Sequence, residues 1–232
     1  MRRTLLALAL ALSMGATAAS AHGHDDGDDG DRGGDVSKVN GGISADAGQH
    51  YGDLGTVNGG ISMGAHASAD DVSTVNGGID IGDDVQVHSI STVNGGIDAG
   101  QRLQVAKDVA TVNGGLHIEF NSHIGGDAGT VNGRITLKQS QVDGEVHTVN
   151  GDITIGAKSV VKGGIHVEQP HGFNFGRQRV PRIVIGPDAT VEGTLRFDRE
   201  VELFVHPSAK IGPVTGAKVR SWTTTLPPRD ED

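Results

Sequence analysis

The sequence contains no cysteine. This absence excludes disulfide bonds, and it also excludes a lipid anchor on a cysteine behind an export signal. Aromatic residues make up only 3% of the chain, whereas glycine occurs 37 times. A conventional globular core uses more large side chains than this. The composition therefore favours a stack of small, regular layers with a narrow aliphatic interior.

Basic residues are scarce relative to acidic ones, and the formal net charge is −10. That balance argues against nucleic acid and anionic membrane surfaces as partners. One apolar run, at residues 5–14, follows two arginines and precedes the small residues 19–21. It is too short to cross a bilayer, and the three parts together predict a signal peptide over residues 1–21. We therefore expect an exported chain without a membrane span, in the periplasm or at the cell surface.

Residues 22–35 contain no apolar side chain and are mostly glycine, aspartate and histidine. This composition predicts a flexible acidic linker. Its aspartates lack the glutamate of an EF-hand loop, so weak, diffuse cation binding is the most they predict. Cleavage after Ala21 would leave His22 and His24 beside a free amine, a nitrogen set that suits Cu(II) or Ni(II) in a square plane. The alternative is an unstructured, soluble tail.

The Val-Asn-Gly triplet occurs seven times, and the step from one copy to the next is always 18 or 19 along the chain. A period this constant is the sequence signature of a solenoid. Identical residues one coil apart stack about 4.8 Å apart, so the asparagine amides are expected to hydrogen-bond along the stack as a structural ladder. The ladder residues are Asn40, Asn58, Asn76, Asn94, Asn113, Asn132 and Asn150.

Each period divides into three groups of six residues. The apolar positions of one period are Val75, Ile81, Val87 and Val93, with further ones four residues after them at Ile79, Val85 and Ile97. Positions i and i+4 share one face of a strand, so these side chains are expected to point inward. The pattern predicts an all-β fold, a single-stranded parallel β-helix with triangular coils of about 18 residues, over residues 36–220. About nine coils would span roughly 45 Å. Residues 221–232 form a C-terminal tail, in which Trp222 is expected to cover the open end.

The corners are expected to need residues with positive φ. Asn-Gly and Gly-Gly supply such conformations, and Gly82, Gly156 and Gly186 are assigned the same role at another corner. Where the period is one residue longer, the extra residue should lie in a corner. The threonines before the valines are expected to face outward with the asparagines, as a lattice that suits ice or a repetitive polysaccharide. They are Thr56, Thr74, Thr92, Thr111, Thr130 and Thr148.

The repeat pattern breaks at residues 168–182, which form an excursion from one corner. This segment holds the one aromatic and basic patch of the acidic chain, and loops often carry function. It is a candidate binding loop for an anionic glycan or a neighbouring molecule, with the alternative that it folds over one face of the helix. Its candidate residues are His171, Phe173, Phe175, Arg177, Arg179 and Arg182.

The repeats "TVNGGI" and "TVNGDITIG" resemble those of the bacterial adhesin family of β-strand-repeat proteins, over residues 39–167. The segment "IGPDATVEGTLRFDREVELFVHPSAKIGPVTGAKV" resembles bactofilins, the polymer-forming bacterial scaffold proteins, over residues 183–219. Both resemblances imply a right-handed parallel β-helix with a structural role. Neither implies a catalytic residue. Bactofilins work in the cytoplasm, whereas this chain is predicted to carry an export signal. Of what the bactofilin resemblance implies, we therefore keep self-assembly and not a cytoskeletal role.

No catalytic constellation is present: the sequence has no Gly-x-Ser-x-Gly elbow, no phosphate loop and no cysteine nucleophile. Histidines such as His117 and His147 are scattered singly and match no zinc motif. Hexapeptide acyltransferases share a β-helix, but they need a catalytic histidine at a subunit cleft, and export argues against them. We therefore expect a non-enzymatic structural or adhesin-like solenoid of the cell envelope without a cofactor, which associates with itself or with envelope polysaccharide. The alternative is a solenoid that binds glycan, ice or metal.

Overall fold

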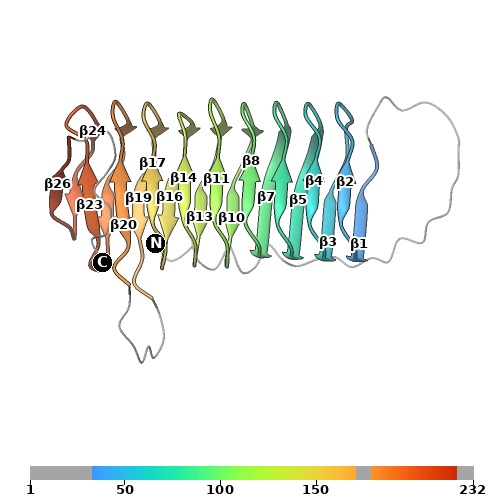
Figure 1. Cartoon of the computed structure of the whole chain (residues 1–232), viewed down its shortest axis with the longest axis horizontal. Coiled ribbons are helices and arrows are strands. Elements are labelled where there is room, and N and C mark those ends of the chain that lie inside the picture. Colours follow the sequence, from blue (N-terminus) through green and yellow to red (C-terminus); the bar gives the residue numbers. More distant parts are fainter. Residues whose placement is uncertain (1–32, 171–178, 224–232) are drawn as a thin grey trace, which may run out of the picture.

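The computed structural model of the chain describes residues 33–170 and 179–223. These residues form an all-β rod in which ten coils follow one another along the long axis (Figure 1). Every strand pairing in the described ranges is parallel, and each joins one coil to the next. The predicted parallel β-helix is confirmed, with ten coils rather than about nine. The signal peptide, most of the linker and residues 224–232 lie outside the described ranges.

The strands lie on three faces of the rod. The first face consists of β1 (Val36–Asn40), β3 (Leu54–Asn58), β5 (Ser68–Asn76), β7 (Gln86–Asn94), β10 (Val109–Thr111), β13 (Ala128–Thr130), β16 (Glu145–Thr148), β19 (Gly164–Val167), β22 (Leu195–Phe197) and β25 (Val214–Thr215). The second face consists of β2 (Ile43–Ala45), β4 (Ile61–Met63), β6 (Ile79–Ile81), β8 (Ile97–Ala99), β11 (Leu116–Ile118), β14 (Ile135–Leu137), β17 (Ile153–Ile155), β20 (Arg182–Ile185), β23 (Glu202–Val205) and β26 (Val219–Ser221). The third face consists of β9 (Gln104–Val105), β12 (His123–Ile124), β15 (Gln141–Val142), β18 (Val160–Val161), β21 (Thr190–Val191) and β24 (Lys210–Ile211).

The early coils differ from the predicted three-strand pattern. β5 and β7 are each nine residues long and run from the third face of one coil onto the first face of the next without a break. Val87 pairs with Val105 and Ile90 pairs with Val109, so the second pair spans one more position of the chain than the first. The extra residue of that coil therefore lies in the corner at residues 106–108. This longer corner separates β9 from β10, and three distinct strands per coil follow from there.

The core is one continuous column of inward side chains, six from each complete coil. In the third coil the inward residues are Val72, Thr74, Ile79, Ile81, Val85 and Val87. Each is at most 5% exposed, and the five apolar ones belong to one hydrophobic cluster that runs through the rod. Fully burying a valine or isoleucine side chain contributes roughly 1.5–3 kcal/mol. The rod is therefore held by the same small contribution repeated in every coil, which explains how it folds with few aromatic residues.

The predicted orientation of the Thr-Val pair is wrong. The threonines that precede the valines point inward, and all six are at most 3% exposed. The valines point outward instead: Val75 and Val93 are half-buried, and Val39 is 67% exposed. Each threonine hydroxyl in five coils donates a hydrogen bond of 2.8–3.0 Å to a glycine carbonyl of the preceding coil, as Thr74 does to Gly59. This internal hydrogen bond satisfies the buried hydroxyl, so the threonine can occupy the interior position that was predicted for the valine.

The predicted positive φ of the Asn-Gly glycines is wrong at six of the seven corners. Of the first glycines after the asparagines, Gly41 alone has positive φ, at 105°. The others are required by close approach: a Cβ on Gly95 would lie 1.9 Å from the carbonyl oxygen of Gly77 in the preceding coil. Glycine is therefore needed at this corner because successive coils nearly touch, and not because the backbone turns into the left-handed region.

The corner between the second and third faces also differs from the prediction. Gly82, Gly156 and Gly186 lie there, but none of the three has positive φ. In each of these corners the residue with positive φ is instead a non-glycine residue, two positions after the glycine, as Asp84 is after Gly82. These corner-tip residues are His66, Asp84, Arg102, Asn121, Gln139, Lys158 and Asp188, with φ between 45° and 62°.

Trp222 does not cover the end of the core. It follows β26 and packs with Val184 and Phe204 in a separate cluster on the outer side of the second face. His206 contacts its ring edge-on, with 5.1 Å between the ring centroids. The tryptophan therefore covers the outside of the sheet in the last three coils.

No helix in the described ranges has the length and apolar character needed to span a membrane.

Candidate functional surfaces

The asparagines form one continuous column of amide hydrogen bonds at the corner between the first and second faces. Each Nδ2 donates to the Oδ1 of the asparagine one coil earlier, over 2.9–3.1 Å. All seven side chains are exposed, so the column lies on the outside of the rod. Because all six bonds run from the later asparagine to the earlier one, the column is directional, and the Oδ1 of Asn150 at its C-terminal end accepts from no asparagine.

Arg199 occupies that end of the column. Its Nη1 donates to the Oδ1 of Asn150 over 2.7 Å and to the backbone oxygen of Val149 over 3.0 Å. Its Nη2 donates to the backbone oxygen of Arg179, over 2.9 Å. Arg199 follows β22, one coil beyond the excursion, so it spans the coil that lacks an asparagine. The guanidinium thus replaces the missing amide donor with a charged one.

Asp152 joins the excursion to the rod. It stands where the first five coils have a second glycine, and its side chain is 9% exposed. Its Oδ2 accepts from Arg179 over 2.9 Å and from Arg134 over 3.4 Å, and its Oδ1 accepts from the backbone N–H of Arg182 over 3.0 Å. The carboxylate therefore holds the returning end of the excursion against the preceding coils.

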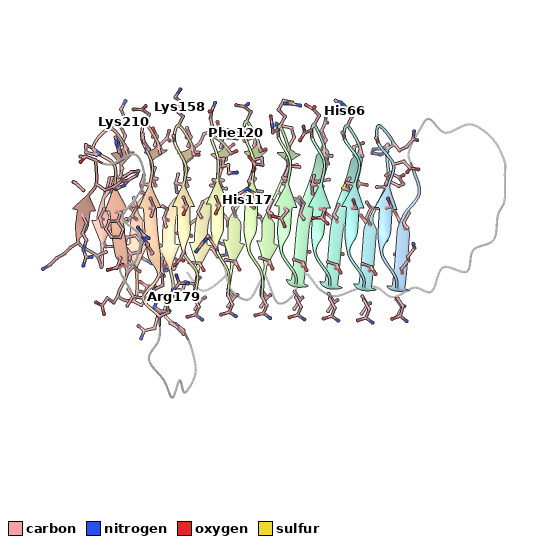
Figure 2. All side chains as sticks on the ribbon, viewed as in Figure 1. His66, His117, Phe120, Lys158, Arg179 and Lys210 are labelled. Carbon is pink, nitrogen blue, oxygen red and sulfur yellow. The ribbon has the colours of Figure 1, made fainter. Side chains whose placement is uncertain are left out.

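The candidate binding loop is described only at its two ends. Its residues His171, Phe173, Phe175 and Arg177 lie outside the described ranges. Arg179 projects from the edge of the rod and remains 69% exposed beyond its contact with Asp152 (Figure 2). Arg182 lies over the ring of Phe204, with 5.0 Å between the guanidinium carbon and the ring centroid. The two described arginines thus hold the loop to the rod, and the binding role of the loop stays a prediction.

Two histidines that the sequence presented as scattered stand side by side on the first face. His147 of β16 pairs in register with His166 of β19, and the next strand places Arg196 beside His166. Both imidazoles are buried, at 8% and 6% exposed, although they project from the outer side of the sheet. Gly129 makes room for His147, because a Cβ there would lie 2.2 Å from Nε2 of the ring.

Carboxylates surround this histidine pair. Nε2 of His166 lies 2.8 Å from Oδ2 of Asp198, and its Nδ1 lies 4.0 Å from Glu145 and 3.9 Å from Glu168. Nη2 of Arg196 also lies 2.7 Å from the same Nε2. One ring nitrogen either donates or accepts, so it forms a hydrogen bond with one of these two neighbours and merely contacts the other. The result is a compact charged patch across three coils.

Glu145 gives this patch a testable pH dependence. Burial raises the pKa of its carboxyl, against the opposing attraction of His166 and His147. A raised folded-state pKa means that the ionised form is less stable in the folded protein, so the carboxylate lowers stability as pH rises from the unfolded-state to the folded-state pKa. We expect Glu145→Gln to raise the melting temperature at pH 7. This gain should shrink as pH falls toward about 4, where glutamate in unfolded chains is protonated.

Thermal unfolding followed by circular dichroism between pH 4 and 8 measures this effect. Glu192→Gln is the matched control, because Glu192 is exposed and follows β21 on the third face. The control should leave the melting temperature unchanged. A Glu145→Gln protein that melts at or below the wild-type temperature at pH 7 contradicts the expectation.

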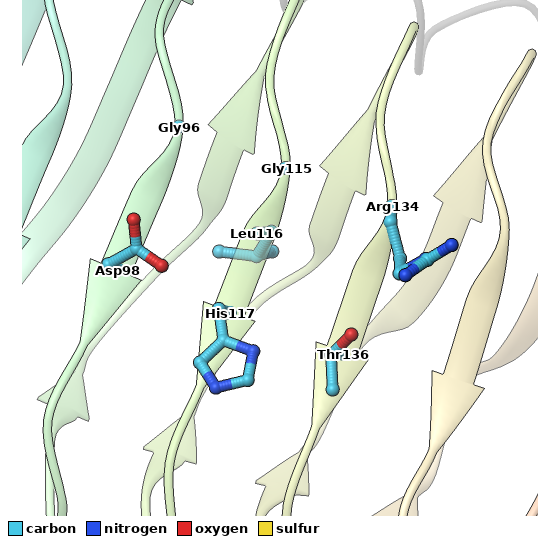
Figure 3. A pocket seen from close by; sticks show the side chains of 7 residues that line it. All are labelled: Gly96, Asp98, Gly115, Leu116, His117, Arg134 and Thr136. Carbon is cyan, nitrogen blue, oxygen red and sulfur yellow. The ribbon is translucent and has the colours of Figure 1, made fainter.

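A shallow open pocket lies on the second face (Figure 3). Asp98, His117 and Thr136 stand on the adjacent strands β8, β11 and β14, in register with one another. Two glycines leave the backbone bare at one end of the pocket, where Arg134 projects. The imidazole Nε2 of His117 lies 2.8 Å from Glu119, and the pKa of Glu119 is lowered mainly by a lysine of the next coil and then by His117. The pocket thus presents polar groups of both signs without an aromatic platform.

The corner-tip residues form another row, along the edge opposite Arg179, and all of them except the half-buried Asp84 are exposed (Figure 2). Arg102 of this row forms a two-pronged ion pair with Asp84 of the preceding coil, with both distances at 2.6 Å. Arg102 is exposed and Asp84 is half-buried, so water screens part of the attraction between them.

The described residues contain no group of three or more His, Asp or Glu side chains arranged to hold a metal ion. The proposed site at His22 and His24, which requires cleavage after Ala21, lies outside the described ranges, as Ala21 itself does. Both the cleavage point and the metal site therefore stay predictions.

These features define the protein as a β-solenoid. Its outer surface repeats regularly along the asparagine column, and near the excursion the column gives way to the contacts of Arg199 and Asp152. Comparisons of the chain with known protein families, with curated proteins and with solved structures found no match in any of the three. The class therefore rests on the fold itself, and the resemblance to adhesins and bactofilins stays a prediction.

Proposed function

We propose that the chain is a non-enzymatic structural or adhesin-like rod of the bacterial cell envelope, exported and associating end to end with further copies. The observation that supports this most strongly is the state of the two ends. Within the described residues, β2 and β26 each pair with a neighbour on one side only, as do β1 and β25. A strand with an unpaired edge offers its backbone N–H and C=O groups to another strand.

The inward column also becomes exposed at the C-terminal end. Val219 of β26 is 47% exposed, whereas its partners on the preceding strands, Leu203 and Ile183, are fully buried. At the other end, Val36 is only partly buried, whereas its partner Leu54 is fully buried. Stacking a further coil on either end would bury these side chains, so apolar burial favours association.

The charges of the two described ends are complementary. The first two described coils, residues 33–71, carry five aspartates and a single lysine. The last two described coils, residues 195–223, carry five lysines and arginines and three carboxylates, of which Glu202 pairs with Arg220 over 3.0 Å. Head-to-tail contact would bring opposite charges together, whereas contact between like ends would bring like charges together. Charge therefore favours a polar, head-to-tail arrangement of the rods.

Analytical ultracentrifugation at low and high salt, with electron microscopy of the same samples, tests this proposal. We expect concentration-dependent association that weakens at high salt, because exposed charges are screened. Lys218→Glu reverses a charge at the basic end and should weaken the association by roughly three- to tenfold at low salt. Lys107→Glu makes the same change in a mid-rod corner and should have no effect. A strict monomer at every concentration, or equal effects of the two variants, contradicts the proposal.

The second candidate is a ligand-binding solenoid, and the pocket at His117 is the observation that favours it. The imidazole of His117, the carboxylate of Asp98 and the guanidinium of Arg134 line this pocket, and such groups can hydrogen-bond the hydroxyl groups of a glycan. The ice-binding version has lost its basis, because the threonine row lies inside the rod. End-to-end association remains the stronger proposal, since it accounts for both ends of the rod.

A further inference from the structure

The asparagine column consists of seven Asn-Gly steps, and an Asn-Gly step carries a reaction of its own. The backbone nitrogen of the glycine can attack the side-chain carbonyl carbon of the asparagine and close a five-membered succinimide ring. Glycine favours this reaction because it has no Cβ to hinder the approach. All seven asparagines are exposed to water, which opens the ring afterwards, whereas the glycine that follows is exposed at the first step, half-buried at the next five and buried at Gly151. The structure distinguishes these seven chemically equal steps in two ways.

The first distinction concerns the attacking nitrogen. In three early coils the glycine N–H donates to the backbone oxygen of the asparagine in the next coil, over 2.9–3.1 Å, as Gly77 does to Asn94. From the fourth coil onward the glycine no longer makes this bond. Instead, the backbone N–H of the asparagine in the next coil donates back to the valine before the earlier asparagine, as Asn113 does to the oxygen of Val93. Among the described residues, the N–H groups of Gly95, Gly114, Gly133 and Gly151 donate no such hydrogen bond to a backbone oxygen. The nitrogen is therefore held in the first three steps and not in the last four.

The second distinction concerns the carbonyl that is attacked. At six steps the side-chain oxygen accepts its hydrogen bond from the neutral amide of the next asparagine. At Asn150 it accepts from Arg199, over 2.7 Å. Arginine remains protonated at any pH where the protein is folded, although burial lowers the pKa of Arg199 from its ordinary value. A charged donor strengthens the hydrogen bond and stabilises negative charge that develops on the oxygen during attack.

We propose that Asn150 is a site of spontaneous covalent modification, promoted by Arg199. Hydroxide removes the proton of the Gly151 amide, and the nitrogen attacks Cγ of Asn150. The N–Cγ bond forms while the carbonyl electrons move onto Oδ1, which faces Arg199. The intermediate collapses, the Cγ–Nδ2 bond breaks, and the amide leaves as ammonia with a proton from water. Water then opens the succinimide to aspartate or isoaspartate, so the net change is one water consumed and one ammonia released.

The surroundings of Asn150 also favour the product and give the change a consequence. The new carboxylate faces the guanidinium of Arg199, which turns a charge-assisted hydrogen bond into an ion pair. Its other neighbour, Oδ1 of Asn132, loses a donor, because the amide nitrogen has left. The isoaspartate form lengthens the backbone beside Gly151, where a Cβ would already lie 1.7 Å from the oxygen of Gly133. Modification therefore loosens the corner from which Arg199 holds the returning end of the excursion.

Peptide mapping by mass spectrometry after incubation of the folded protein at mildly alkaline pH tests the proposal. The seven steps act as internal controls for one another. We expect conversion at Asn150 to be roughly tenfold faster than at Asn94, Asn113 and Asn132, because its oxygen faces a charged donor. The first three steps should be slower still. In denaturant the seven rates should approach one another, because the fold no longer separates them.

Arg199→Gln should lower conversion at Asn150 to the rate of Asn132 and leave the other steps unchanged. Arg220→Gln is the matched control, because it removes an arginine of the last coil that lies away from the column. Circular dichroism verifies that both variants are folded. Equal rates at Asn150 and Asn132 in the folded wild type overturn the proposal, even if Arg199→Gln does not fold. So does a faster rate at Asn150 that persists in denaturant, because the local sequence would then explain it.

Discussion

Replacing Gly95 with alanine is expected to destabilise the rod by about 3 kcal/mol or more. The new methyl carbon would lie 1.9 Å from the carbonyl oxygen of Gly77, and the contacting atoms are backbone atoms of the preceding coil. No rotamer change relieves such a contact, so the two coils must separate or the corner must rebuild. From Gly59 to Gly151, the first glycine of every Asn-Gly corner makes the same contact, at 1.7–2.2 Å. Urea denaturation followed by circular dichroism measures the loss of stability.

Gly96→Ala is the matched control for this experiment. Gly96 is the next residue in the same corner, but a Cβ there would lie 3.4 Å from the nearest backbone oxygen, an ordinary contact. The equivalent positions of later coils hold Arg134 and Asp152, so the fold accepts a side chain here. We expect a change within about 1 kcal/mol. If the two alanine variants have the same stability, close approach is not the reason for the first glycine.

The coil and most of its interior could be predicted from the sequence, because each strand contributes an apolar side chain at fixed spacing. Ile79, Ile81, Val85 and Val87 are buried as the pattern indicates. The Thr-Val pair could not be assigned in this way. In β5 the inward side chains alternate through Val72 and Thr74, so the threonine takes the inward position that the six-residue spacing of apolar residues had assigned to the valine. Hydrophobicity favoured the valine, whereas the glycine carbonyl of the preceding coil favours the threonine hydroxyl.

The polar contacts near the excursion were missed for a different reason. Asp152 meets Arg179, and Asn150 meets Arg199, across the inserted segment. Because the excursion adds residues between them, no multiple of the coil period connects these positions. The histidine pair did leave a signal. His147 and His166 stand one coil step apart in the sequence, so on one face of a solenoid they are expected to stack.

Substituting aspartate at Thr74 and at Val75 gives a second large effect and decides which of the two side chains points inward. Thr74 is fully buried, and its hydroxyl donates to the oxygen of Gly59 over 2.8 Å. A carboxylate there cannot donate and faces a carbonyl oxygen inside an apolar column. We expect Thr74→Asp to cost several kcal/mol, about 4 or more, or to prevent folding of the surrounding coils.

Val75→Asp is the paired variant, in the adjacent residue and with the same final side chain. Val75 is half-buried on the outer side of the first face, so its carboxylate remains in contact with water. It should cost no more than about 1 kcal/mol. Denaturant unfolding of the two proteins gives the comparison, and Thr74→Ser, which keeps the hydroxyl, separates the charge from the loss of a methyl group. The orientation inferred from hydrophobicity alone predicts the opposite order. A more stable Thr74→Asp than Val75→Asp protein would therefore show that valine, not threonine, lines the interior.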